Sequence, residues 1–127
     1  MKRILLADDN SELRTMMQEW LEDAGYHVDT AANGLEVLEQ QTRTPADLVI
    51  TDMCMPKVDG LETIVALRRQ DPGIKIIAIS GDDGDHGRNY LRAAESFGAV
   101  RSFAKPVRSG DLLAAVRELM GATVTES

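Results

Sequence analysis

The chain has 127 residues, the length of one domain, and its 43% hydrophobic and 28% charged residues are typical of a folded chain rather than a disordered one. The 14 Lys and Arg against 21 Asp and Glu give a net charge of −7, which argues against direct nucleic-acid binding because phosphate affinity needs clustered cations. No apolar run approaches the roughly 18 residues of a membrane span, and Asp8 interrupts the N-terminal apolar run too early for a signal peptide. The single cysteine excludes an intrachain disulfide, so we expect a cytoplasmic protein without membrane insertion.

Short apolar segments spread along the chain predict buried strands. They are Arg3–Ala7, Val28–Ala32, Asp47–Thr51, Lys75–Ser80 and Val100–Ala104. The first, third and fourth are apolar at successive positions rather than at alternate ones, which is typical of strands covered on both faces. The second segment has the weakest strand pattern of the set.

Segments of helical period separate these strands. After Asn10, apolar residues recur along one helix face as far as Ala24, with Asn10 or Ser11 as the cap and Gly25 as the stop. The segment Gly81–Gly87, with three glycines and three aspartates, is predicted to be a loop. The other predicted helices are Leu35–Gln41, Leu61–Arg69, Asn89–Phe97 and Leu112–Met120.

The alternation of strand and helix predicts an α/β fold. Right-handed crossovers between successive strands give a parallel sheet with helices on both faces. No linker divides the chain, so we expect one domain over residues 1–122 and a short flexible tail over residues 123–127.

Polar residues fall at the carboxyl ends of the predicted strands. Asp8 and Asp9 follow the first strand, Asp52 follows the third, Ser80 ends the fourth, and Lys105 follows the fifth. Open parallel sheets bind ligands at this edge. Three carboxylates, a hydroxyl and an ammonium group are therefore expected to meet there.

The charges of this cluster indicate what it could bind. Three carboxylates at short range repel each other, and a hard divalent cation such as Mg²⁺ or Mn²⁺ would relieve the repulsion. Lys105 would then suit a further anion, and a phosphoryl group fits between metal, ammonium and hydroxyl. An aspartate can attack phosphorus to form an acyl phosphate. Each residue alone could be a solvated loop residue, but the joint arrangement favours a site.

Several motifs, in order along the chain, carry a resemblance to a known family. They are Asp8-Asp9, Asp52-Met53-Cys54-Met55-Pro56-Lys57-Val58-Asp59-Gly60, Ile79-Ser80-Gly81, Gly98-Ala99 and Phe103-Ala104-Lys105-Pro106. From Arg3 to Met120 the sequence resembles the receiver domain of two-component response regulators. The resemblance implies a flavodoxin-like (βα)5 fold, a doubly wound parallel sheet of five strands in the order 2-1-3-4-5.

The resemblance also implies a role for each acidic residue of the cluster. Asp52 would be the phosphoacceptor, and a histidine kinase or phosphotransfer protein would supply the phosphoryl group. Asp9 would bind Mg²⁺ directly, and Asp8 would help directly or through water. Asp52 and the backbone carbonyl of Cys54 would complete the protein ligands.

The remaining motif residues would carry the response to phosphorylation. By the same resemblance, Lys105 would pair with the phosphoryl group, Ser80 would move inward and donate to it, and Phe103 would rotate after Ser80. The Lys105–Pro106 bond would be cis. The fourth helix, fifth strand and fifth helix would form the surface offered to a downstream protein partner. Gly81 departs from the pattern, since the family usually has Ala there.

Other functions remain open at this point. The chain is expected to be a stand-alone receiver, and the main alternative is a receiver excised from a longer regulator, for example a DNA-binding one. A metal-dependent phosphohydrolase would also use Asp52 as nucleophile, but Cys54 stands where such enzymes tend to place a second acid. We therefore expect a signalling switch with at most slow self-dephosphorylation, not an enzyme. A nucleotide- or flavin-binding protein would need a Gly- or Ser/Thr-rich phosphate loop after the first strand, and it is rejected because the Asp8-Asp9-Asn10 turn would repel phosphate in the absence of a metal.

Overall fold

The computed structural model describes residues 2–53, 60–81 and 84–121, without the side chains of residues 84–90. Strands and helices alternate through these residues, as predicted. The strands are β1 (Arg3–Ala7), β2 (His27–Ala31), β3 (Leu48–Asp52), β4 (Lys75–Ser80) and β5 (Arg101–Ala104). The helices are α1 (Ser11–Asp23), α2 (Gly34–Arg43), α3 (Gly60–Gln70), α4 (Gly84–Phe97) and α5 (Ser109–Met120).

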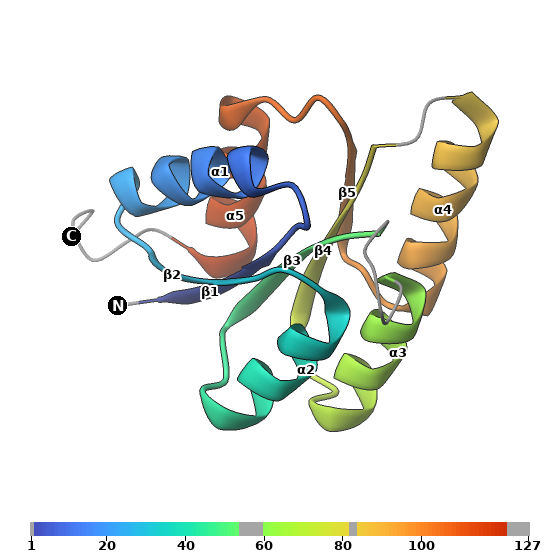
Figure 1. Ribbon diagram of the computed structural model, residues 1–127, viewed down its shortest axis with the longest axis horizontal. Helices are drawn as coiled ribbons and strands as arrows, with labels where there is room; N and C mark the ends of the chain where they lie inside the picture. Colours follow the sequence, from blue (N-terminus) through green and yellow to red (C-terminus); the bar gives the residue numbers. More distant parts are fainter. Residues whose placement is uncertain (1, 54–59, 82–83, 122–127) are drawn as a thin grey trace.

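The strands form one parallel sheet in the order β2-β1-β3-β4-β5 (Figure 1). This order confirms the flavodoxin-like fold. In the register of the central pair, Ala7 of β1 lies opposite Thr51 of β3. The residue after Ala7 is Asp8, and the residue after Thr51 is Asp52. The register therefore places these two acids at the same edge of the sheet.

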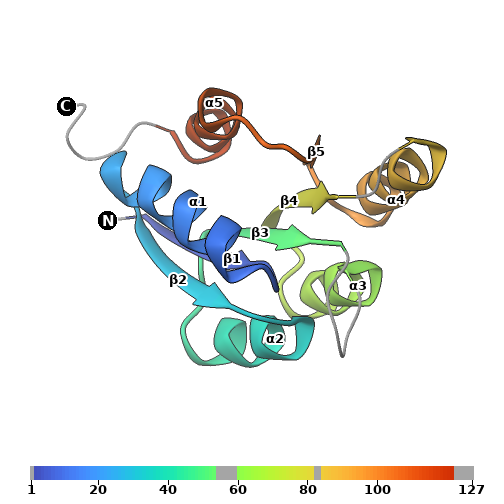
Figure 2. The same cartoon turned by 45° about the horizontal axis from the view of Figure 1, so that its top comes forward.

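Helices cover both faces of the sheet (Figure 2). α1 and α5 pack on one face over Ile4 and Leu6, and α2, α3 and α4 pack on the other over Leu5 and Ala7. Alternate residues of β1 therefore enter different cores, which explains why the strand is apolar at every position. Trp20 packs against the first of these cores from α1.

Most predicted bounds agree with the structure to within a few residues. β1 and β4 agree at both ends, and the bounds of β2, β3 and β5 shift by one residue. α1 is capped by Asn10, whose side chain accepts a hydrogen bond from the backbone N–H of Leu13, and Gly25 follows the helix with φ of 99°. The predicted caps of the first helix are thus confirmed.

The predicted loop Gly81–Gly87 is wrong from Gly84 onward. α4 begins at Gly84, five residues before the predicted start at Asn89. Glycine disfavours a helix by about 1 kcal/mol relative to alanine. Extending an existing helix gains one hydrogen bond for each residue fixed, and it avoids the cost of forming a new helical nucleus. These gains outweigh the glycine cost.

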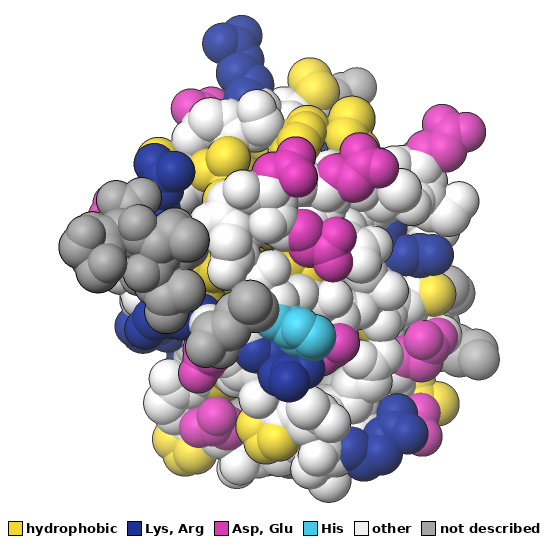
Figure 3. Space-filling model, turned by 90° about the vertical axis from the view of Figure 1, so that its left-hand side faces the viewer, with side chains coloured by type: hydrophobic (Ala, Val, Ile, Leu, Met, Phe, Trp, Pro, Cys, Tyr) yellow, Lys and Arg dark blue, Asp and Glu magenta, His cyan; other side chains and the backbone are white. Residues whose placement is uncertain are grey.

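The face of the molecule shown in Figure 3 mixes acidic and basic side chains. On β1 and β2, the Arg3 guanidinium lies 2.7 Å from an Asp29 carboxylate oxygen, and His27 lies 3.3 Å from the other oxygen. Within the residues described, no helix combines the length and the apolar character that a bilayer crossing requires.

Candidate functional site

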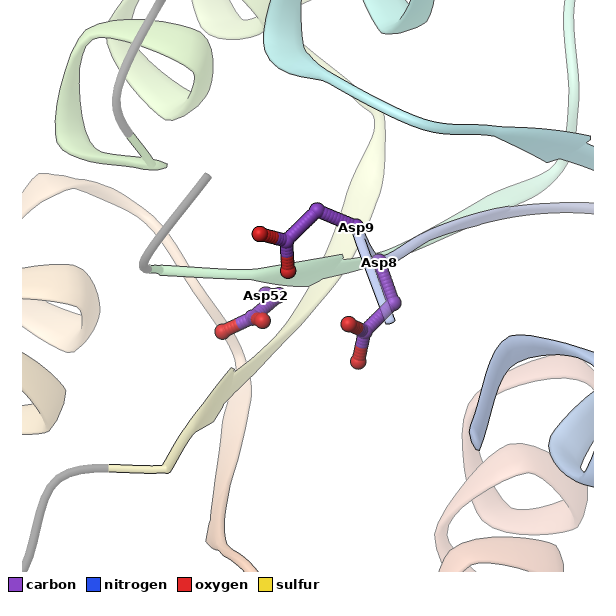
Figure 4. A group of neighbouring side chains, drawn as sticks. All are labelled: Asp8, Asp9 and Asp52. Carbon is purple, nitrogen blue, oxygen red and sulfur yellow. The ribbon is translucent and has the colours of Figure 1, made fainter. Parts of the chain in front are cut away.

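Three acidic side chains meet at the carboxyl edge of the sheet. Asp8, Asp9 and Asp52 each place a carboxylate oxygen within 4.8 Å of the others (Figure 4). Asp8 and Asp52 are 0% and 2% exposed, whereas Asp9 is exposed. The cluster is therefore a partly buried group of like charges with one open side.

Asp8 is held by hydrogen bonds at its backbone and its side chain. Its N–H donates to the carbonyl of Ala31 on β2 over 3.2 Å. Its Oδ1 accepts from the backbone N–H of Asn10 at 2.9 Å, and its carbonyl accepts from Arg14 Nη1 at 2.7 Å. The turn from β1 into α1 thus fixes where the carboxylate lies.

The second carboxylate oxygen of Asp8 is suited to bind a cation. Oδ2 is buried and receives no hydrogen bond of acceptable direction from the described residues, although Lys105 Nζ lies 3.2 Å away as an ion-pair partner. The contact between Lys105 Nζ and Asp8 Oδ2 is therefore an ion pair without a well-directed hydrogen bond. Buried polar atoms are nearly always satisfied, and carboxylate oxygens suit Mg²⁺. The donor set therefore fits a divalent metal.

Lys105 bridges the acids of β1 and β3. Its Nζ lies 3.1 Å from Asp52 Oδ2 and 3.2 Å from Asp8 Oδ2. Burial lowers the pKa of Lys105, but the carboxylates of Asp52 and Asp8 outweigh it, so the pKa stands above its ordinary value of 10.5. The ammonium group is therefore charged at neutral pH.

The loop after β5 places Lys105 beside the end of β4. The backbone N–H of Lys105 donates to the carbonyl of Ser80 over 2.8 Å. The peptide bond between Lys105 and Pro106 is cis, as the resemblance implies. A Cβ at Gly81 would lie 3.1 Å from Lys105 Cδ, so the glycine allows the lysine stem to pass close to the backbone.

Ser80 and Phe103 lie on neighbouring strands of the same region. Ser80 is fully buried at the end of β4, and Phe103 is half-buried on β5, against the core under α1 and α5. In the register, Phe103 lies opposite Ile79, the residue before Ser80. Of the predicted site residues, only Cys54 lies outside the described residues.

Sequence reasoning missed one residue that shapes this site and assigned no role to another, which it had quoted only as part of a motif. The missed residue is Arg14, and its only signal is its place one helical turn after the Asn10 cap. The residue without an assigned role is Gly60, where a Cβ would lie 2.6 Å from the Met53 Cα. Gly60 also donates its N–H to the Met53 carbonyl over 3.3 Å. Because only glycine fits there, α3 can begin directly against the residue that follows Asp52.

Residues 4–117 match the family model of the response regulator receiver domain. The chain therefore belongs to the response regulator receiver family of two-component systems. Receiver domains of this family are signalling switches that interact with histidine kinases or phosphotransfer proteins, and they generally bind Mg²⁺ through acidic residues. The acidic cluster stands at the carboxyl edge that this fold uses for ligands.

Curated relatives include proteins of the same length and longer ones. The chain is 42% identical over 81 residues to the response regulator receiver protein CpdR of Brucella abortus, covering 64% of this chain and 68% of CpdR. It is 30% identical to sporulation initiation phosphotransferase F of Bacillus subtilis over 94% of each chain. It is 32% identical to the transcriptional regulatory protein PrrA of Mycobacterium leprae, over 98% of this chain but only 54% of PrrA. The chain thus spans about half the length of some relatives.

Solved structures agree with this assignment. A response regulator receiver domain protein from Clostridium thermocellum superposes with a TM-score of 0.86 at 31% identity over 94% of both chains. The chemotaxis protein CheY4 of Vibrio cholerae superposes with a TM-score of 0.83 at 29% identity, over 94% of this chain and 99% of CheY4.

Proposed function

We propose that this receiver accepts a phosphoryl group on Asp52 in a reaction that depends on Mg²⁺. The observation that carries the proposal is the ion pair of Lys105 with both Asp52 and Asp8, next to the open side of a three-carboxylate cluster. Three carboxylates and one ammonium leave two negative charges uncompensated. A single divalent cation would match them.

The metal would be held by the carboxylates of Asp8, Asp9 and Asp52, together with the backbone carbonyl of Cys54. Bound there, Mg²⁺ would neutralise charge on the phosphoryl oxygens during transfer. Asp8 contributes its buried Oδ2, and its Oδ1 stays engaged with the Asn10 N–H. The exposed Asp9 completes the set from the solvent side.

The transfer step uses Asp52 as nucleophile. A carboxylate oxygen of Asp52 attacks phosphorus, the bond from phosphorus to the donor imidazole nitrogen breaks, and an acyl phosphate forms. The imidazole leaves with the electron pair of the broken bond. Lys105 moves its ammonium group from the Asp52 carboxylate to a phosphoryl oxygen. Because Lys105 already lies 3.1 Å from Asp52, this needs only a small displacement.

A shallow groove beside Lys105 suits the approach of a protein donor. It is lined by Asn10, Glu12, Leu13, Met16, Lys105, Pro106 and Val107. Met16 is 43% exposed, which leaves an apolar surface next to the reacting group. A histidine kinase or phosphotransfer protein would cover this groove while its phosphohistidine reaches Asp52.

Phosphorylation would then alter the surface formed by α4, β5 and α5. Ser80 would donate its hydroxyl to the phosphoryl group, and Phe103 would rotate toward the space that Ser80 leaves. In support, Ser80 and Phe103 lie on adjacent strands, and Phe103 belongs to the strand at the sheet's edge. The altered surface would control a protein partner in the cytoplasm, without direct nucleic-acid contact by this domain.

A receiver that forms part of a longer regulator is the second candidate. The observation in its favour is that the match to PrrA covers only 54% of that transcriptional regulatory protein. Phosphorylation of Asp52 would then control an attached domain in place of a separate partner. Sequencing the open reading frame around this segment decides between the two.

The test of the phosphoacceptor is intact mass spectrometry after incubation with acetyl phosphate and Mg²⁺. Wild type should gain one phosphoryl group, and chelation of the metal should prevent the gain. Asp52→Asn should gain none, whereas Asp111→Asn, a change at an exposed residue of α5, should behave as wild type. Incorporation into Asp52→Asn at the wild-type rate contradicts the proposal.

A further inference from the structure

Arg14 on α1 has no role in the function proposed above. We propose that Arg14 is a positioning residue for the metal site, because it holds the peptide that joins Asp8 to Asp9. This inference rests on the proposed Mg²⁺ dependence of the domain. It concerns the placing of the ligands and not a contact with the metal.

The contact between Arg14 and the site is short and partly shielded from water. Arg14 Nη1 donates to the backbone carbonyl of Asp8 over 2.7 Å, and the arginine is half-buried. The backbone N–H of Arg14 donates to the carbonyl of Asn10 over 2.9 Å. The N–H of Asn10 in turn donates to Asp8 Oδ1 over 2.9 Å. These three hydrogen bonds close a ring through Asp8, Asn10 and Arg14.

The ring acts on both acids through the geometry of one peptide. The carbonyl of Asp8 lies in the same plane as the nitrogen and Cα of Asp9, because the peptide bond is planar. Fixing that carbonyl therefore fixes where the Asp9 side chain begins. Because Asp9 is exposed, core packing does not hold its side chain in place. The buried Asp8 Oδ2 is aligned by the same ring, since Oδ1 is one of its acceptors.

Charge and position predict opposite effects when Arg14 is replaced. Arg14 is a cation near a site for a cation, so charge alone predicts that its removal strengthens metal binding. Loss of positioning predicts that removal weakens binding, because the ligands lose their alignment. Groups that orient metal ligands change metal affinity by roughly 10- to 100-fold when they are lost. The sign of the change therefore separates the two effects.

Arg68 provides a matched control in another part of the molecule. On α3 it also donates to backbone carbonyls, those of Pro72 and Gly98, at the amino-terminal edge of the sheet. Arg68→Gln removes a cation and its carbonyl hydrogen bonds as Arg14→Gln does. It leaves the Asp8 peptide untouched.

The experiment measures metal affinity and unfolding of the metal-free protein for wild type, Arg14→Gln, Arg14→Lys and Arg68→Gln. Free Mn²⁺ is followed by its paramagnetic resonance signal, and Mg²⁺ affinity is obtained by competition. Arg14→Gln should weaken binding about tenfold, at the lower end of the range for such groups. Arg14→Lys should recover part of the loss, since it keeps one charged donor. Arg68→Gln should stay within about twofold of wild type, although both glutamine variants should lose stability without metal.

The outcomes separate this inference from the proposed function. Binding by Arg14→Gln that equals or exceeds wild type overturns the inference, and so does an equal loss in Arg68→Gln. If Arg14→Gln fails to fold, Arg14→Lys decides alone, because wild-type affinity in that variant overturns the positioning role. A wild-type protein that binds neither ion overturns the metal dependence of the proposed function, and the inference with it.

Discussion

β3 and β5 differ in how firmly the core holds them. Every residue of β3 is buried, and β3 has a strand on each side, whereas no residue of β5 is buried and β5 pairs with β4 alone in the described sheet. Asp52 is therefore carried by a strand that cannot shift without opening the core. Phe103 lies on an edge strand, β5, and Lys105 directly follows it. This strand can shift at lower cost in free energy.

Lys105 joins these two regions. Its backbone follows the edge strand, and its ammonium group pairs with acids at the ends of β1 and β3. The proposed acceptor, Asp52, is therefore held by the core, whereas the proposed responding residue, Phe103, lies on a less constrained strand. The following predictions test this difference, beginning with the largest expected effect.

Replacing Lys105 by methionine should cost the most. It leaves Asp8 and Asp52 buried without their counter-ion, and breaking such a pair costs roughly 3 kcal/mol, the lower end of the usual range because Lys105 is partly exposed. Urea unfolding without metal measures the loss. The control is Lys75→Met, since the Lys75 ammonium lies on the surface against the carbonyl of Leu119. Equal stability of the two variants would contradict the bridging role.

The stability of the metal-free protein should fall at alkaline pH. The pKa of Lys105 in the folded state lies above its unfolded value of 10.5, because the attraction of the Asp52 and Asp8 carboxylates exceeds the effect of burial. The protonated form therefore stabilises the fold fully below pH 10.5, and this stabilisation is lost as pH rises through the folded pKa. Urea titrations across this range should show a steeper fall for wild type than for Lys105→Met. Parallel curves would show that Lys105 does not contribute.

Asp9→Ala should remove the stabilisation that Mg²⁺ gives. With metal at a hundred times its Kd, wild type should gain about 2.7 kcal/mol, and the variant should gain less than about 1 kcal/mol. The exposed Asp23→Ala at the end of α1 serves as control and should respond as wild type. Without metal, Asp9→Ala should be equally or slightly more stable, because one repelling charge is gone. An unchanged response to Mg²⁺ would place the metal elsewhere.

Ser80→Ala should separate acceptance of phosphate from the response of the edge strand. The variant should still be phosphorylated, since Asp52, the metal ligands and Lys105 remain. It should lose most of the rise in hydrogen-exchange protection that phosphorylation gives to Phe103 in wild type. Wild type should show a similar rise over the glycine-rich segment 81–87, part of which lies outside the described residues.

The control for this measurement is Ser102→Ala on the same strand. The Ser102 hydroxyl bonds Glu95 of α4 over 2.7 Å and takes no part in the site. Ser102→Ala should therefore keep the rise in hydrogen-exchange protection at Phe103. A full rise in Ser80→Ala, or no rise in wild type, would show that Ser80 does not link the phosphate to β5.

Gly81→Ala should have the smallest effect. Its Cβ would meet Lys105 Cδ at 3.1 Å, so the flexible lysine stem must shift by a few tenths of an ångström. The initial rate of phosphorylation by acetyl phosphate should fall by roughly two- to fivefold, because positioning dominates this chemistry. Gly110→Ala on α5, which has nothing within 4 Å, should leave the rate unchanged. An equal rate of phosphorylation for Gly81→Ala and Gly110→Ala would show that Lys105 tolerates a Cβ at position 81.

The sequence predicted the edge where the site lies because the signals for it are local. Apolar runs with a polar residue at the carboxyl end fix where Asp8, Asp52 and Ser80 lie in any parallel sheet. The start of α4 was misjudged for the converse reason. Glycine and aspartate at 81–87 indicate a loop by propensity, but the helix extends through Gly84 once the rest of it has formed.

The sequence alone determined the fold class, the family and the acids of the candidate site, since periodicity and motif spacing are written along the chain. That Lys105 bridges Asp52 and Asp8 became visible only in the folded structure, because Asp52 lies 53 residues away along the chain. Only it showed that Asp8 Oδ2 is buried and that Arg14 reaches the Asp8 carbonyl. The reason is physical: a side chain's direction and burial depend on what packs around it, and packing joins residues that no local pattern connects.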